Sequence, residues 1–438
     1  MRVVTGGTAE AAGDFRWYWF SQTLSFTGDR LTGFAVPSIA ILTLGASGAE
    51  VGALAATGWL AYPVLGLVAG GVLAQLPRRP VMIAGELVRF TAFATIPLAA
   101  LAGWISTTQL FVVVAIAGVA TVFVDIAGQS YLPALVNGPA LVGANSRLQS
   151  SDSLSKLAGP ALAGAALKVA GPYAGLFLSA LPFLASAFGR TRIRAIEPPV
   201  DPSVEAMTTR IRSGLGFVWR HDLLRRLVGA AAVRSLGIGM VDAVLLLFAY
   251  RALGLSSLQG GLLIAAGAVG GLIGALVANR LAARLGMRRA LLLTGLEGLC
   301  WLAIPLCLLA APVIALALIR ICASIWMPMW NILTTSLRQH LTPPGRQSTV
   351  HATARTLTSA TIPLGALIGG LAGDVLGRQL GTSAGLVVVL AVGGVLAGSS
   401  VLLVGPSSGQ VFPLSDVQVV PRSQRRSVSP CVQPPHES

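Results

Sequence analysis

The chain has 438 residues, 54% of them hydrophobic and only 11% charged, with a formal net charge of +15 at pH 7. Apolar runs of about 20 residues recur along it, which excludes a soluble domain and places the chain in a lipid bilayer. The positive charge does not indicate nucleic-acid binding, because the arginines fall in short loops between apolar runs. Metal-ligand clusters, phosphate loops and catalytic triads are absent from the sequence, so we expect no metal, no cofactor and no enzyme activity.

Six apolar spans are predicted between a polar cytosolic tail at 1–14 and residue 188. The polar start and the length of the first span argue against a cleavable signal peptide. We expect the spans to form an N-terminal bundle over residues 15–188. They cover Phe15–Leu42, Val51–Ala74, Val81–Gly103, Leu110–Leu132, Ala144–Leu167 and Tyr173–Phe188.

A basic connector at 189–226, with several prolines, separates these spans from a second set of six. The second set is expected to form a C-terminal bundle over residues 227–404. Residues 405–438 are rich in Ser, Pro and Arg and are predicted to be a disordered cytosolic tail. The six spans cover Leu227–Tyr250, Gln259–Ala282, Arg289–Leu309, Val313–Leu337, Ser348–Ala372 and Ser383–Val404.

The two halves of the chain echo each other at an offset of roughly 200 residues. Glu86 and Glu297 follow basic loops, and Pro160 and Pro363 lie in Gly/Ala-rich runs. Parallel repeats of six spans are typical of secondary transporters, whose site lies between the repeats. We therefore predict an all-α integral membrane protein with twelve transmembrane helices in two pseudo-symmetric six-helix bundles.

Four stretches resemble the major facilitator superfamily. Gly71–Arg89 resembles its signature loop between spans two and three, although Gln75 stands where the family has an acid. Tyr131–Gly164 and Asn331–Gly377 are similar to the branch of bacterial macrolide and siderophore exporters, and Gly274–Arg289 is a weak second copy of the signature loop. The resemblance implies an exporter of the cell membrane that works by alternating access. It also implies that the protein is a monomer.

The resemblance also implies roles for particular residues. The gating loop comprises Gly71, Gln75, Arg78, Arg79, Glu86 and Arg89. The helix-bend signature, which looks like the antiporter motif of span five and its repeat, comprises Gly159, Pro160, Gly164 and Pro363. A proline bends a helix, and glycines let a neighbouring helix approach closely.

Charges within spans are the candidates for proton coupling or substrate binding, because each is costly to insert in a membrane. Asp29 and Arg30 are neighbours, so on a helix they point about 100° apart. Asp152 and Lys156 share a helix face, either for transport or as a plain ion pair. The remaining candidates are Asp125 and Arg355. Asp29 and Asp152 are expected to be the best-placed coupling acids, and Asp125 to lie at a depth similar to that of Asp152.

The sequence thus favours a secondary transporter that exports a small amphipathic compound, such as a drug, siderophore or secondary metabolite, against inward proton flow. The alternatives are an importer or uniporter for a metabolite and a non-transporting sensor of the same fold. The sensor is disfavoured because the chain contains no soluble domain. The implied partners are the substrate, protons and the lipid bilayer.

Arginine placement yields a testable topology. Arginines gather in the loops on one side of the predicted spans, and the positive-inside rule places that side, both termini and the connector in the cytoplasm. Reporter fusions at Ser203 and Ser429 should therefore give cytoplasmic signals. An extracytoplasmic signal at either position would contradict the predicted topology.

Overall fold

The computed structural model describes residues 8–73, 76–136, 140–195, 215–309, 311–343 and 347–404. In these ranges the chain is helical, without strands. The N half contains helices α1 (Thr8–Leu42), α2 (Gly48–Leu73), α3 (Arg78–Leu101), α4 (Thr107–Leu135), α5 (Ala140–Ala170) and α6 (Pro172–Thr191). Each matches one predicted span, although α1 begins inside the predicted tail.

The C half is less regular than its predicted spans. It contains α8 (Asp222–Leu247) with the π-helical turn η1 (Phe248–Ala252), α9 (Ser257–Leu285), α10 (Met287–Leu293), α11 (Leu296–Leu302), the 3-10 turn η2 (Ile304–Leu308), α12 (Pro312–Ser324), α13 (Trp326–Leu341), α14 (Gln347–Leu380), α15 (Thr382–Ser399) and the 3-10 turn η4 (Ser400–Leu403).

Predicted spans nine and ten are interrupted rather than continuous. The ninth is divided among α10, α11 and η2, and the tenth between α12 and α13. Gly295 lies between α10 and α11, Pro305 lies in η2, and Pro328 lies in the first turn of α13. Because proline lacks an amide hydrogen and clashes with the preceding turn, it interrupts helical hydrogen bonding.

Nine helical segments within the described residues are long and apolar enough to cross a membrane. The other three segments that match predicted spans are α1, α2 and α5. Charged residues lie along the middle of α1 and α5. The count of twelve spans therefore stays a prediction.

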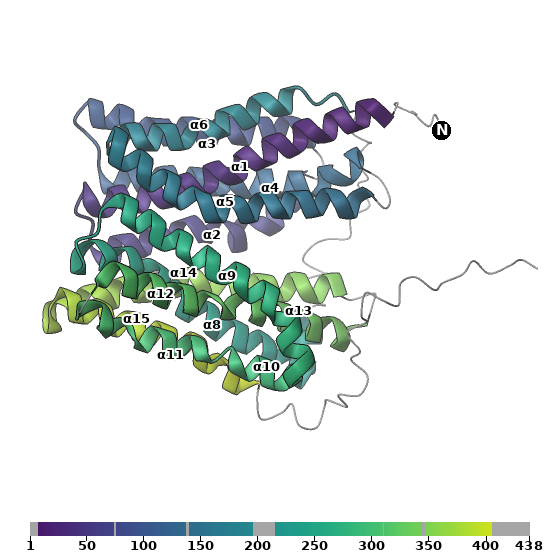
Figure 1. Ribbon diagram of the computed structural model, residues 1–438. Coiled ribbons are helices and arrows are strands. Elements are labelled where there is room, and N and C mark those ends of the chain that lie inside the picture. The colour runs from purple at the N-terminus through teal and green to yellow at the C-terminus, as the bar shows by residue number, and fades with distance from the viewer. Residues whose placement is uncertain are drawn as a thin grey trace, which may run out of the picture.

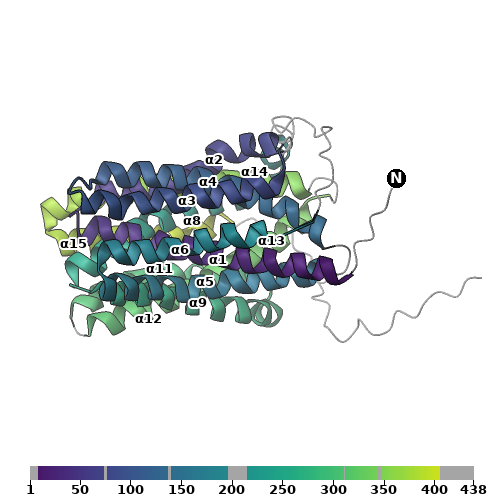
Figure 2. The same ribbon diagram turned by 90° about the horizontal axis from the view of Figure 1, so that it is seen from above.

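The two halves lie side by side, and the axes of their helices are roughly aligned (Figures 1 and 2). Within the N half, α1 packs on α5 and α6, and α3 on α4 and α6. Contacts between the halves are made mainly by α14 with α2 and by α5 with α9. We call the end where α1 begins and η4 ends the terminal face, and the other end the opposite face.

Glycines permit close contact between the halves near the opposite face. A Cβ added to Gly164 of α5 would lie 2.4 Å from the carbonyl oxygen of Ser257 in α9. One added to Gly261 would lie 2.2 Å from the carbonyl oxygen of Pro160. These distances are too short for a side chain, so the helix-bend glycine and proline of α5 lie where the two halves meet.

The helices that carry Pro160 and Pro363 remain continuous through both prolines. The connector residues 196–214, the tail 405–438 and Gln75 lie outside the described residues. The predicted connector 189–226 includes Arg190. In the structure it belongs to α6 and is fully buried.

Candidate functional site

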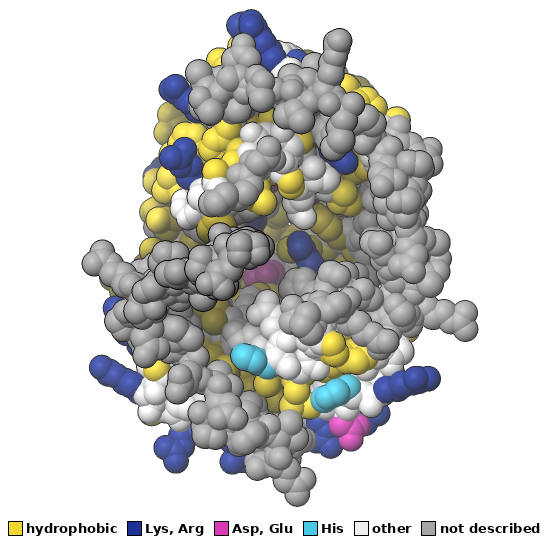
Figure 3. Space-filling view, turned by 90° about the vertical axis from the view of Figure 1, so that its right-hand side faces the viewer, with side chains coloured by type: hydrophobic (Ala, Val, Ile, Leu, Met, Phe, Trp, Pro, Cys, Tyr) yellow, Lys and Arg dark blue, Asp and Glu magenta, His cyan; other side chains and the backbone are white. Residues whose placement is uncertain are grey.

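The terminal face is hollowed near its centre (Figure 3). An acidic and a basic side chain are visible inside the hollow. The opposite face is joined between the halves, where the buried hydroxyls of Ser38 in α1 and Tyr250 in η1 lie 2.8 Å apart. Charged residues in the middle of α1, α4 and α5 are therefore the ones that belong to the candidate site.

Asp29 and Arg30 face different neighbours, as expected for adjacent residues of a helix. Asp29 accepts a hydrogen bond from Arg89 of α3 at 2.7 Å. Arg30 donates to Asp152 of α5 at 2.9 Å. A Cβ on Gly159 would lie 2.5 Å from the Cβ of Arg30, so this glycine leaves the space that the arginine occupies. The two adjacent charges thereby connect α1 to two separate helices.

Asp152 is neutralised from two sides. Lys156, one turn along α5, pairs with the second carboxylate oxygen, while Arg30 pairs with the first. The expected pair of Asp152 and Lys156 is thus present, with Arg30 as an additional partner. Asp125 instead lies within electrostatic range of Asp29.

A buried network surrounds Glu86 in the core of the N half. Its carboxylate pairs with Arg89, three residues along α3, and with Arg190 of α6 at 2.9 Å. The Ser186 hydroxyl donates to the same carboxylate at 3.0 Å. Arg190 also donates to Gln22 of α1. Sequence spacing pointed to the pair of Glu86 and Arg89, but it contained no signal for Arg190, which comes from a distant helix.

Asp125 differs from Asp29, Glu86 and Asp152, because no described cation forms an ion pair with it. Its only described hydrogen-bond donor is the hydroxyl of Tyr62 in α2. Arg355, on α14 of the C half, is exposed and lies within electrostatic range of Tyr62. The site therefore contains one carboxylate that is hydrogen-bonded to a neutral hydroxyl, and a cation of the other half lies within electrostatic range of that hydroxyl.

The C half holds a simpler set of charges. Arg234 of α8 pairs with Glu297 of α11, both buried, and its guanidinium lies 5.1 Å from the centre of the Trp330 ring. Glu297 thus matches Glu86 in being a buried acid paired with arginine. Asp242 of α8 lies 3.8 Å from Arg320 of α12, and its side chain is 52% exposed. No cluster of three or more metal-binding side chains occurs in the part of the chain that the structure describes.

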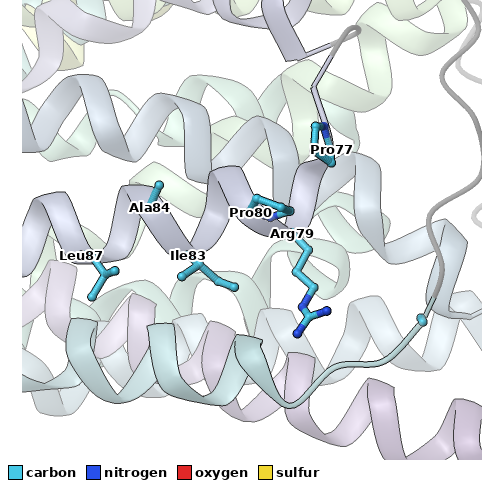
Figure 4. Close-up of a pocket in the computed structure, with 7 residues that line it drawn as sticks. Pro77, Arg79, Pro80, Ile83, Ala84 and Leu87 are labelled. Atoms are coloured by element: carbon cyan, nitrogen blue, oxygen red, sulfur yellow. The ribbon is translucent and has the colours of Figure 1, made fainter.

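Apart from Glu86 and Arg89, the described residues of the gating loop lie away from these charges. Arg79 donates to the backbone carbonyls of Arg190 and Thr191 at the end of α6, at 3.0 and 2.6 Å. Figure 4 shows it directed toward that end, beside a pocket on the outer side of α3. Arg78 begins α3, and Gly71 lies in the last turn of α2. The pocket is lined by Pro77, Arg79, Pro80, Ile83, Ala84, Leu87 and Ala195 and includes none of the candidate acids.

Comparisons with known proteins agree with this architecture. The pattern of the Major Facilitator Superfamily matches residues 18–361. The multidrug efflux pump Tap of Mycolicibacterium fortuitum is 27% identical over 371 residues, which cover 82% of this chain and 88% of the pump. The identity is too low to transfer its substrates.

Two solved structures have a similar fold. A bacterial homologue of the iron transporter ferroportin, in an inward-facing state, aligns with a TM-score of 0.70 at 20% identity, over 90% of this chain and 99% of its own. The nucleoside transporter NupG aligns with a TM-score of 0.71 at 11% identity, over 89% of this chain and 98% of its own. At these identities the likeness concerns the fold alone.

The buried network predicts a specific stability defect. Replacing Glu86 by Gln leaves Arg190 without its carboxylate partner in the core, and breaking a buried ion pair costs about 3–5 kcal/mol. The Glu86→Gln variant should therefore show lower membrane abundance and a lower melting temperature in detergent.

The matched control for this experiment is Asp222→Asn, which breaks the exposed pair of Asp222 and Arg225. An exposed pair contributes about 0–1 kcal/mol, so this variant should behave like the parent. Equal stability of the two variants would contradict a structural role for Glu86.

Proposed function

Because this chain belongs to the major facilitator superfamily, and is therefore a multi-pass membrane transporter rather than an enzyme, we propose that it is a proton-coupled exporter of small amphipathic compounds. Export is supported by the similarity to a multidrug efflux pump. The proposed location is the bacterial cytoplasmic membrane, with both termini in the cytoplasm and the protein acting as a monomer. In that orientation the hollow opens to the cytoplasm.

Asp125 is the observation that carries the proton-coupling proposal. A charge in the membrane interior costs roughly 2.5–3.5 kcal/mol on insertion scales, and no described cation pairs with this carboxylate. Binding a proton removes that charge. Asp29 and Asp152, the acids expected from the sequence, are each already balanced by arginine or lysine. The proposal therefore assigns the coupling proton to Asp125.

The proton affinity of Asp125 is expected to depend on the conformation, because the residues around it belong to different halves. Tyr62 and Asp125 both belong to the N half, whereas Arg355 belongs to the C half. Transporters built from repeats alternate by rocking one half against the other. Such a motion changes the distance from Arg355 to Tyr62, and so to the carboxylate of Asp125 that Tyr62 contacts, and a nearby cation favours the charged carboxylate. The proton is then bound in one conformation and released in the other.

The test uses everted membrane vesicles, an imposed proton gradient and ethidium as a cationic amphipathic probe. Asp125→Asn should reduce gradient-driven ethidium accumulation at least tenfold at unchanged protein abundance. Tyr62→Phe should retain coupling but move its pH dependence to higher pH, because the carboxylate loses a hydrogen bond that favours its charged form.

Asp152→Asn combined with Lys156→Gln serves as the matched comparison, since it removes a charge pair without disturbing Asp125. This double variant should retain gradient-driven transport if the pair is structural. Normal coupling in Asp125→Asn would overturn the assignment, and ethidium transport that ignores the gradient would make the protein a uniporter.

A further inference from the structure

At the opposite face, one acidic and one basic side chain of the C half bind the same turn of the N half. The turn joins α1 to α2 over residues 43–47. Asp374, near the end of α14, accepts hydrogen bonds from the backbone N–H groups of Gly48 at 2.7 Å and Ala49 at 2.8 Å. These residues begin α2, whose first N–H groups have no partner within the helix.

Arg251 makes the complementary contact with the same turn. Its guanidinium donates to the backbone carbonyls of Gly45 and Ala46, which follow the last residue of α1. The Asp374 carboxylate thus meets the positive end of the α2 dipole, and the Arg251 guanidinium binds carbonyls of the turn that precedes α2. Both charges come from the C half, so they join the halves without forming an ion pair with each other.

The π-helical turn η1 explains how Arg251 reaches the N half. Tyr250, the residue before it, lies at hydrogen-bond distance from Ser38 of α1. Both neighbours in the sequence therefore contact the N half, although successive residues of an α-helix point about 100° apart. Single π-helical turns frequently occur at functional sites.

Close backbone contact surrounds the Asp374 interaction. A Cβ on Gly370 of α14 would lie 2.2 Å from the carbonyl oxygen of Gly48. A Cβ on Gly52 of α2 would lie 2.4 Å from the carbonyl oxygen of Ala366. No side chain fits between the backbones of α2 and α14 at this contact. If the two helices separated here, water would have to hydrate the polar groups that now bind one another.

We propose that Arg251 and Asp374 are positioning residues that hold the opposite face closed and so set the balance between the two transport conformations. The proposal rests on the alternating access assumed in the proposed function. Neither residue lies near the candidate acids, so each acts on transport through the conformation of the whole protein. Hydrogen bonds to charged groups are strong enough that losing one pair should raise the opened population about tenfold.

The experiment measures distances between spin labels in the full-length protein by pulsed electron resonance, with the native cysteines replaced by serine. One pair of labels, at Thr108 and Gln379, spans the opposite face. A second pair, at Asn145 and Arg284, spans the terminal face. Arg251→Gln and Asp374→Asn should each add a longer distance at the opposite face and a shorter one at the terminal face.

Reciprocal change at the two faces distinguishes a positioning role from loosened packing, which would broaden both distances. Asp374→Glu keeps the charge and should retain more of the closed population than Asp374→Asn. The matched control is Arg378→Gln, which removes an exposed charge one turn further along α14 and should leave both distances unchanged. Any variant that elutes as an aggregate is replaced by its conservative counterpart, Arg251→Lys or Asp374→Glu.

Parent-like distances in both Arg251→Gln and Asp374→Asn would overturn the proposal, as would an equal response in Arg378→Gln. The distances are recorded without substrate or proton gradient. If Asp125 does not carry the coupling proton, the distances still test the roles of Arg251 and Asp374. If the distances do not change, the transport assay still tests the role of Asp125.

Discussion

The need to balance charge inside an apolar bundle governs how this protein is built. A charge buried in a membrane has no water to solvate it, so it must be paired, hydrogen-bonded or neutralised by a proton. Glu86 meets this need with two arginines from two helices, and Glu297 meets it with Arg234. Each of these pairs joins helices of the same half.

Asp125 is the exception, because no described cation pairs with it, and the proposed function assigns the coupling proton to it. Its hydrogen-bond donor is Tyr62 of its own half, and Arg355 of the other half lies within electrostatic range of that tyrosine. The ion pairs of Glu86 and Glu297 lie within one half and can persist when one half rocks against the other. The distance from Arg355 to Tyr62 and Asp125 would change in the same motion. At the opposite face, Asp374 binds the first N–H groups of α2 and Arg251 binds carbonyls of the preceding turn, so both contacts would be lost if the halves separated there.

Local features of the site were predictable from the sequence, and features that depend on packing were not. The helix period was sufficient to separate Asp29 from Arg30 and to pair Asp152 with Lys156, because both relations lie within one helix. The bonds of Arg190 to Glu86 and of Tyr62 to Asp125 join helices far apart in the sequence. No sequence pattern indicated that Arg251 and Asp374 contact the other half, since their partners are backbone groups without a side-chain signature. The breaks in the ninth and tenth spans follow from Gly295, Pro305 and Pro328, which hydropathy alone does not weigh.

The central claim is that Asp125 binds the coupling proton in one conformation and releases it in the other, which links proton binding to substrate binding. It is tested most directly by measuring protons released when purified protein in detergent binds ethidium, with a pH-indicator dye in weak buffer. The account predicts release of about one proton per bound ethidium from the parent protein at a pH where Asp125 is protonated, by linkage of the two equilibria. It predicts no release from Asp125→Asn. Undiminished proton release from Asp125→Asn would contradict the account.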